Sequence, residues 1–265
     1  MSKLRIGVSG AAGRMGKRLV ALTLHDEELT LAAALDAKGH PAIGQDAGVS
    51  AGEAASNVNI ADDLPGDEVD ALIDFSVPAG AQRATELCRE RKIPLVMATT
   101  GLSEAQEQLV RDAANEIPVV WAPSMSMAVN LTMKLAAMTG RTLKGADADV
   151  EIIERHHRFK EDAPSGTALR FGEIIAGEMG LTNHQHGREG RPGERPHNEL
   201  GYHAVRVGDN PGEHTLIFGM LGETIELTVR ASNRDCYASG ALMAAKFAAK
   251  QSPGLYDMFA VLGLS

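Results

Sequence analysis

The chain has 265 residues, of which 44% are hydrophobic and 23% charged, a composition typical of globular proteins rather than disordered or fibrous ones. Aromatic residues make up only 4%, which argues against a surface that stacks nucleic-acid bases. A net charge of −9 is the wrong sign for a nucleic-acid or anionic-membrane surface. These properties favour a small-molecule partner, and the 28 glycines suggest a backbone that approaches a ligand closely.

The N-terminal residues 1–7 enter an apolar strand without a signal-peptide pattern. The longest uncharged segment, Ile117–Met133, is interrupted by prolines and polar residues, which argues against a membrane span. Cys88 and Cys236 belong to no metal or redox motif, as is typical of a reducing compartment. We therefore expect a cytoplasmic protein.

The first half of the chain alternates short apolar runs with helical segments. Strands are expected at Leu4–Ser9, Leu29–Leu35, Val69–Phe75, Ile93–Ala98 and Val119–Ala122, and helices at Arg14–Leu24, Pro78–Arg91 and Glu104–Glu116. This alternation predicts an α/β fold with a doubly wound parallel sheet covered by helices on both faces.

The regular alternation of strands and helices ends near residue 125, which predicts a second domain that mixes helices and strands in another order. It is expected to contain a helix at Ser126–Leu143, a strand at Val150–Arg155, a helix at Gly166–Met179, a loop at Thr182–Leu200, and strands at His203–Val207, His214–Gly219 and Thr224–Ala231. Glycine-rich turns between the last three strands indicate antiparallel hairpins. The pattern does not assign the final helix, Cys236–Lys250, or the segment Leu255–Leu262 to either domain.

A glycine loop, Gly10-Ala11-Ala12-Gly13-Arg14-Met15-Gly16, follows the first strand and opens the first helix. Its G-x-x-G-x-x-G spacing is a variant of the dinucleotide-binding fingerprint, in which glycines let a pyrophosphate approach backbone amides. Asp36 ends the second strand, where a carboxylate would bind ribose hydroxyls. The alternative is a glycine-rich turn with a surface aspartate. Because the acid repels a 2′-phosphate while Lys38, beyond Ala37, weakens that repulsion, we expect NADH to be preferred and NADPH tolerated.

Three later strand ends should border the same ligand-binding crevice as the glycine loop and Asp36, because ligands bind beyond the carboxyl ends of parallel strands. They are Asp74-Phe75-Ser76, Ala98-Thr99-Thr100-Gly101 and Ala122-Pro123-Ser124-Met125. Their hydroxyls and amides are candidates to position a nicotinamide ribose. Phe75 is a candidate cofactor contact, although a ring buried in the core is nearly as good an interpretation.

The segment Glu154–Ala168, ERHHRFKEDAPSGTA, places two imidazoles and several cations before Ser165-Gly166-Thr167 at a predicted helix start. Cations and free helix amides are suited to a small dicarboxylate, and an imidazole or ammonium can deliver a proton. The alternatives are that Ser165 is only a helix cap and the cations form a solvated loop. A metal site is not expected, because His156 and His157 lack a third ligand at a suitable spacing.

With these motifs the sequence resembles the dihydrodipicolinate reductase family of bacterial lysine and diaminopimelate synthesis. The resemblance is carried by Gly10–Gly16, Ala98–Gly101 and above all Glu154–Ala168. It extends to Val205–Asp209, Gly212–Thr215, Arg230–Arg234 and Gly254–Met258, and so spans nearly the whole chain.

The resemblance implies a Rossmann-like dinucleotide-binding domain over residues 1–125, to which 236–265 return, and a substrate-binding and tetramerisation domain over 126–235, built on an open mixed sheet. It implies a homotetramer that reduces 4-hydroxy-tetrahydrodipicolinate with NAD(P)H. His156 would be the proton donor or acceptor, and Lys160 a second proton donor. His157, Ser165, Gly166 and Thr167 would hold substrate carboxylate, with Arg234 assisting. The cofactor positions carried over are Gly10–Met15, Asp36, Ala98–Thr100 and Ala122–Met125.

The sequence departs from the family pattern in three places. Ala37 stands where members that use both cofactors often have arginine, Met125 replaces a common phenylalanine, and Val229 stands where histidine is common. Three other functions compete with this interpretation: a related reductase acting on another small acid, a non-catalytic nucleotide sensor, and a metal-dependent hydrolase using His156 and His157.

Overall fold

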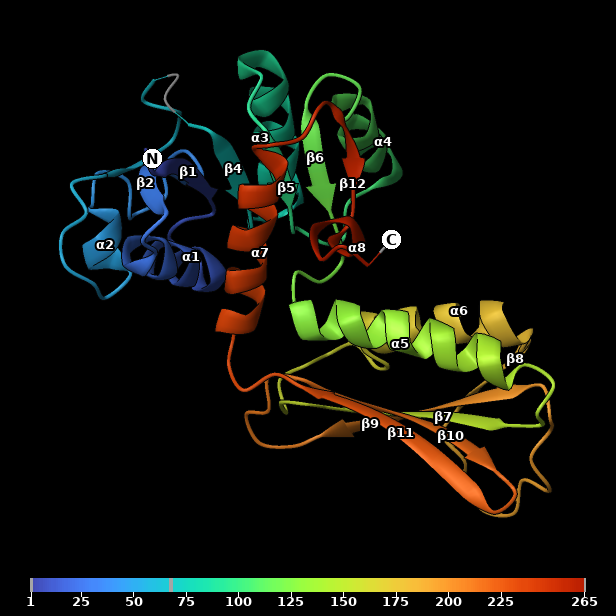
Figure 1. Ribbon diagram of the computed structural model, residues 1–265. Helices are drawn as coiled ribbons and strands as arrows, with labels where there is room; N and C mark the ends of the chain where they lie inside the picture. Colours follow the sequence, from blue (N-terminus) through green and yellow to red (C-terminus); the bar gives the residue numbers. More distant parts are fainter. Residues whose placement is uncertain (1, 67–68, 265) are drawn as a thin grey trace. The chain divides into compact units, whose positions relative to one another are not determined.

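The computed structural model describes residues 2–66 and 69–264 (Figure 1). Met1, Ser265 and residues 67 and 68, which fall within the predicted domains, lie outside the described residues. The chain divides into two compact units: the first unit is Met1–Met127 with Arg234–Ser265, and the second unit is Ala128–Asn233. None of the helices in the described ranges is long and apolar enough to cross a membrane.

The strands are β1 Leu4–Ser9, β2 Leu29–Leu35, β3 Ile60–Ala61, β4 Ala71–Asp74, β5 Leu95–Met97, β6 Pro118–Trp121, β7 Asp149–His156, β8 Asn183–His186, β9 Glu199–Arg206, β10 Glu213–Met220, β11 Glu223–Arg230 and β12 Gly254–Tyr256. The helices are α1 Arg14–His25, α2 Ala47–Ser50, α3 Pro78–Arg91, α4 Glu104–Ala113, α5 Met127–Leu143, α6 Gly166–Met179, α7 Asp235–Ala248 and α8 Met258–Val261.

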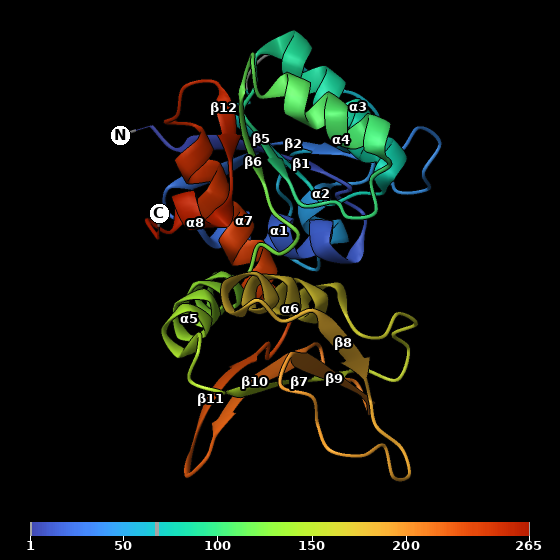
Figure 2. The same ribbon diagram turned by 90° about the vertical axis from the view of Figure 1, so that its right-hand side faces the viewer.

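The first unit is built on a parallel sheet with the strand order β12-β6-β5-β4-β1-β2-β3. One apolar cluster joins a face of this sheet to α1, α7 and α8, and a second joins the opposite face to α3 and α4, as Figures 1 and 2 show. Strands buried on both faces are uniformly apolar, which explains runs such as Leu95–Met97. The doubly wound α/β prediction is confirmed.

The strand order reverses between β1 and β4, because β2 extends the sheet on one side of β1 and β4 to β6 extend it on the other. In open parallel sheets this reversal leaves a crevice beyond the carboxyl ends of the two strands. The glycine loop after β1 and Phe75 after β4 lie at this place.

The second unit contains a mixed sheet with the order β11-β10-β7-β9-β8. Strand β10 pairs antiparallel with β11 and β7, whereas β9 pairs parallel with β7 and β8. Helices α5 and α6 of this unit lie on one face of the sheet (Figures 1 and 2). Val150, Ile152, Glu154 and His156 alternate along β7 and are all buried, so the two polar residues lie on the same inward face as the apolar ones.

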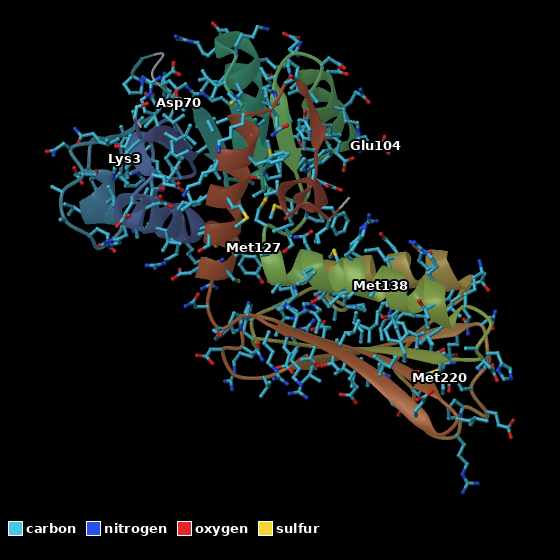
Figure 3. The ribbon with its side chains drawn as sticks, in the orientation of Figure 1. Lys3, Asp70, Glu104, Met127, Met138 and Met220 are labelled. Atoms are coloured by element: carbon cyan, nitrogen blue, oxygen red, sulfur yellow. The ribbon has the colours of Figure 1, made fainter. Side chains whose placement is uncertain are left out.

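The hairpin prediction for the second unit is partly wrong. β10 and β11 form the expected hairpin, whose turn follows Met220 (labelled in Figure 3). β9 and β10 do not pair, because β7 lies between them. Turn residues and apolar runs locate strands along the chain, but they do not reveal that an earlier strand occupies the centre of the sheet.

Short elements account for the other differences. The predicted loop Thr182–Leu200 contains β8 and the start of β9, and α2 and β3 lie in a segment where no element was expected. The segment Leu255–Leu262 contributes to β12, which pairs with β6 at the edge of the first unit's sheet, and to α8. The polar strand β8, with sequence NHQH, has no apolar pattern that would reveal it.

Candidate functional site

A cavity of about 570 Å³ lies in the first unit, at the reversal between β1 and β4. Eight of the predicted cofactor residues line it. They are Gly10, Gly13, Arg14, Met15, Asp36, Ala37, Lys38 and Phe75. The cavity is therefore built from the glycine loop, the end of β2 and the residue after β4.

Two glycines of the loop are required by close approaches of the backbone. Gly10 has a φ of +78°, and a Cβ there would lie 2.7 Å from the carbonyl oxygen of Phe75. A Cβ on Gly16 would lie 2.0 Å from the carbonyl oxygen of Gly10. Neither position accepts a side chain without displacing backbone: Gly10 lets the loop lie against the end of β4, and Gly16 lets the start of α1 lie against the loop.

The first turn of α1 has amide groups to offer a ligand. The cap residue Gly13 has no side chain to accept a hydrogen bond from them, and the first amides of a helix have no partner within the helix. The amides of Arg14 and Met15 therefore suit an anion such as a pyrophosphate, which the positive end of the helix dipole also favours. These features fit a dinucleotide.

Asp36 has a structural role that the sequence did not reveal. Its carboxylate accepts hydrogen bonds from the amides of Ala12 at 2.9 Å and Ala37 at 2.8 Å. The acid thus ties the glycine loop to the end of β2, and it also lines the cavity.

Asp74 forms a buried polar cluster at the ends of β4 and β5. It accepts hydrogen bonds from the hydroxyl groups of Thr99 at 2.5 Å and Ser76 at 2.7 Å, and Thr99 Oγ1 also accepts from the Ser76 amide at 3.0 Å. Burial raises the pKa of Asp74 although these hydrogen bonds oppose the rise. Because the Thr99 hydroxyl is already engaged, its contribution to a ligand would come through the backbone.

The remaining predicted cofactor residues do not line the cavity. Ala98 and Thr100 follow β5, and Ala122, Pro123, Ser124 and Met125 follow β6, so they lie beyond the same ends of parallel strands as Gly10. Ala11 and the side chain of Met125 are buried in the apolar cluster shared with α1 and α7. Phe75 packs partly against this cluster and also lines the cavity, so both interpretations of its ring apply.

Sequence reasoning missed several cavity residues. They are His40, Asp62, Asp63, Val77, Ala79, Gly80 and Arg83. Val77 directly follows the recognised strand end Asp74-Phe75-Ser76, so its position was the available signal. Asp62 and Asp63 follow β3, a two-residue strand too short to be recognised from its pattern.

The second unit gathers the histidine cluster around Glu154, an almost fully buried residue of β7. Both oxygens of the Glu154 carboxylate accept hydrogen bonds from the Arg206 guanidinium, each at 2.8 Å. The carboxylate also accepts from the amide of Ser165 at 3.1 Å, and its Oε2 lies 2.6 Å from His156 Nδ1. Burial alone would raise the pKa of Glu154, but the hydrogen bonds from Arg206 and His156 outweigh it and hold that pKa below its ordinary value.

Burial likewise disfavours the charged form of the two neighbouring imidazoles. It lowers the pKa of His156, although Glu154 partly offsets the effect. It lowers the pKa of His214 to about 4. The two rings meet edge to face with centroids 5.3 Å apart, and burial favours the neutral form of both.

Ser165 precedes helix α6, and its hydroxyl accepts from the amide of Ala168 at 3.2 Å and lies 3.0 Å from His214 Nε2. Ser165 is therefore a helix cap, buried and already bonded. The amides of Gly166 and Thr167 in the first turn have no partner within the helix, and the space where a Gly166 side chain would stand is open. A carboxylate can reach these amides.

The loop after β7 carries the other predicted residues. Lys160 is only partly exposed and pairs with Asp162 at 2.8 Å, and the backbone of His157 is held by Asn210. No group among the described residues hydrogen-bonds to the buried Nδ1 of His157. Buried polar atoms are normally bonded, so this nitrogen is suited to a ligand. Arg234 caps α7 in the first unit, and its role with the substrate remains a prediction.

Sequence reasoning assigned no role to Glu154, Arg206 or His214. The available signal was the alternation in β7: an acid at position 154 falls on the same face as Val150 and Ile152, and a buried acid needs a partner. No group of three histidine, cysteine, aspartate or glutamate side chains within residues 2–66 and 69–264 is arranged to hold a metal ion.

Comparison with known proteins adds independent information. The family model described as "Dihydrodipicolinate reductase, N-terminus" matches residues 4–125, and "Dihydrodipicolinate reductase, C-terminus" matches 128–262. A 4-hydroxy-tetrahydrodipicolinate reductase of Rhodopirellula baltica is 57% identical, with 99% of this chain and 97% of that protein covered. The corresponding enzyme of Hahella chejuensis is 46% identical over 98% of this chain and 99% of that protein.

Among solved structures, a dipicolinate-bound dihydrodipicolinate reductase from a Paenisporosarcina species resembles the chain with a TM-score of 0.78 and 25% identity. The alignment covers 97% of this chain and 98% of that one. An amine dehydrogenase from Mycobacterium smegmatis shares the fold with a TM-score of 0.61 at 12% identity, with 96% of this chain and 94% of that one covered.

Proposed function

Because this chain belongs to the dihydrodipicolinate reductase family, we propose that its glycine-loop cavity binds NAD(P)H and that the His156 cluster binds and protonates the substrate. The chain is an enzyme of lysine biosynthesis that reduces 4-hydroxy-tetrahydrodipicolinate. In this reaction the substrate, NAD(P)H and a proton give tetrahydrodipicolinate, NAD(P)⁺ and water. The proposal assigns the reaction's parts to particular residues.

The cofactor proposal is supported by the fit of the first unit. The amides at the start of α1 would bind the pyrophosphate, Asp36 would accept from the ribose, and the strand ends 98–100 and 122–125 would border the nicotinamide. When bound, NAD(P)H supplies a hydride to the substrate ring.

The substrate proposal rests on the second unit. His156 carries the proton that accompanies reduction, and Lys160 is a second donor. The free amides of Gly166 and Thr167 at the positive end of α6, together with the unpartnered nitrogen of His157, would hold a carboxylate. Ser165 contributes by setting the start of this helix. The buried His156–Glu154 hydrogen bond of 2.6 Å is the observation that carries the proposal, because it holds a proton-carrying imidazole next to these amides.

NADH is the preferred cofactor in our proposal, and NADPH is tolerated. Asp36 repels a 2′-phosphate, while Lys38 and Arg83 line the same cavity and offset part of that repulsion. Paired steady-state kinetics with NADH and NADPH test this preference. A kcat/KM at least as high with NADPH would contradict it.

We also propose that the protein is a cytoplasmic homotetramer. The face of the second unit's sheet opposite α5 and α6 presents Ile153, Val205 and Ile217, with Val205 38% exposed. Apolar side chains on a sheet face without helices of its own are suited to burial against other copies of the chain. The two cysteines, both free, fit a reducing compartment.

The decisive experiment follows NADH absorbance after mixing the enzyme with the condensation product of aspartate semialdehyde and pyruvate. The proposal expects substrate-dependent oxidation of NADH, which His156→Gln lowers by roughly 10²–10⁴ in kcat with little change in NADH affinity. Unchanged turnover in this variant would remove His156 from the mechanism. NADH binding without oxidation would indicate a nucleotide sensor, and activity abolished by chelators would indicate a metal-dependent hydrolase.

A further inference from the structure

The carboxylate of Glu154 is the centre of the buried polar network in the second unit. Its side chain is 1% exposed, Arg206 and the Ser165 amide donate hydrogen bonds to it, and His156 Nδ1 lies 2.6 Å from its Oε2. An ionised carboxylate only accepts hydrogen bonds. The group facing it from His156 must therefore be Nδ1–H, which leaves Nε2 as the ring nitrogen that can exchange a proton with a ligand.

We propose that Glu154 is a positioning residue of the reaction: it fixes the orientation and tautomer of His156 and links that ring to the start of α6, while Arg206 holds Glu154 in place. This inference rests on the proposed role of His156. The same carboxylate binds the Ser165 amide through Oε1 and His156 through Oε2. One side chain thereby holds the proton-carrying ring and the carboxylate-binding helix turn in a single frame.

The bidentate contact with Arg206 explains how an acid can act in this way while buried. An isolated buried carboxylate would take up a proton, and it would then lose the charge that favours the imidazolium and could donate to Nδ1 instead of only accepting from it. Arg206 comes from β9, the parallel neighbour of β7, at the register position opposite His156. The strand pairing thus delivers the guanidinium to the acid. Arg206 also donates to the carbonyl oxygen of Asp162 at 2.7 Å, which anchors the loop that carries Lys160.

The pH dependence of His156 depends on the charged groups around it. Glu154 on β7 favours the imidazolium, whereas Arg206 on β9 and Lys160 in the loop oppose it. His214 on β10 faces the ring edge, and Ser165 at the start of α6 contributes an uncharged amide and hydroxyl. If Glu154 loses its charge, burial and the two cations act on His156 without compensation, and its pKa falls further.

The first test compares Glu154→Gln with wild type and with Glu173→Gln, an exposed control on α6 that pairs with Arg170. Because protonated His156 is the donor, kcat declines as pH rises through its pKa. We expect Glu154→Gln to lower kcat at neutral pH by roughly 10²-fold or more, the scale of losing a carboxylate that orients a catalytic histidine. The decline should move to lower pH, and Glu154→Asp should recover part of the activity. Glu173→Gln should match wild type.

A structural role alone would predict a different result, in which kcat and its pH dependence remain those of wild type while the unfolding midpoint falls. That outcome in Glu154→Gln would overturn the inference. If His156→Gln also retains turnover, the proposed function of His156 fails as well. If only His156→Gln loses turnover, the failure is confined to Glu154.

A second test leaves Glu154 in place and so does not depend on the folding of Glu154→Gln. Long-range ¹⁵N–¹H NMR of the wild-type enzyme, with His156 assigned by comparison with His156→Gln, reports the tautomer of the neutral ring. We expect the proton on Nδ1. A neutral ring with its proton on Nε2 would overturn the inference even if His156 proves catalytic.

Discussion

Gly240 lies where helix α7 passes against the segment after β6, and we predict that Gly240→Ala destabilises the first unit. A Cβ at this position would lie 1.8 Å from the carbonyl oxygen of Met125 and 2.8 Å from its carbonyl carbon. Unbonded heavy atoms rest at about 3.5 Å, so helix and segment must separate by more than 1 Å. The obstacle is backbone, which cannot rotate away as a side chain can.

Two opposing effects set the magnitude. Alanine gains up to about 1 kcal/mol over glycine in a helix interior, while overpacking a filled site costs roughly 1–3 kcal/mol or more. The rigid obstacle puts Gly240→Ala at the upper end, so we expect a net loss of about 2 kcal/mol in the free energy of unfolding. Affinity for NADH should fall as well, because the displaced residues 122–126 overlap the strand end assigned to the cofactor.

Gly177→Ala is the matched control. Gly177 lies on the exposed side of α6, and a Cβ there meets nothing within 4 Å, so the same substitution should stabilise its helix by up to about 1 kcal/mol. Urea unfolding followed by circular dichroism gives the overall change, and hydrogen exchange of the α7 and α6 amides assigns it to each unit. An unfolding midpoint for Gly240→Ala at or above that of wild type would refute the reasoning.

Three further predictions concern the loop, the buried histidine and the sheet face. Gly16→Ala should weaken NADH binding about tenfold or more, measured by fluorescence titration, because its Cβ would lie 2.0 Å from the Gly10 carbonyl oxygen and the displaced loop would lose charge-assisted hydrogen bonds. Burial lowers the pKa of His214 from 6.5 to about 4, so the unfolded chain binds the extra proton and stability falls as pH drops through that window. His214→Gln should remove up to about 3 kcal/mol of this acid-induced loss in the free energy of unfolding. The unfolding midpoint of the variant should therefore depend less on pH than that of wild type. Ile217→Arg should reduce the oligomer mass measured by light scattering, whereas Val49→Arg, on an exposed position of the first unit, should not; an unchanged mass for Ile217→Arg would contradict the proposed interface.

The sequence predicts the first unit well because its strands and helices have strong, separate patterns. Leu4–Ser9 and Pro78–Arg91 have the predicted bounds, and the alternation of strands and helices implies parallel pairing. The second unit was less predictable: β9 has a clear apolar pattern but pairs parallel with β7, and pairing depends on the whole sheet. β8 and β12 are short strands whose places depend on neighbours and not on their own residues.

The chemistry of the site was predictable where it lies in one continuous segment. Glu154–Ala168 contains the histidines, the lysine and the start of α6, and the structure keeps them together at the end of β7. Arg206 and His214 could not be inferred from that segment, because they reach it through strand pairing with β7. For Asp36 the structural role could not be predicted. Its position after β2 indicated a ligand, but its hydrogen bonds with the amides of Ala12 and Ala37 depend on the folded conformation of the loop.

Ser165 shows why a structural and a functional interpretation of one residue need not compete. The cap interpretation is correct, since its hydroxyl is taken by the Ala168 amide and lies against His214, and a ligand would have to displace these contacts to use it. The cap nevertheless serves binding, because it satisfies the third amide of α6 and leaves those of Gly166 and Thr167 free at the positive end of the helix. Its own amide is held by Glu154, the acid that also holds His156. The position of the free amides relative to the imidazole is thus set by a residue whose side chain is fully engaged.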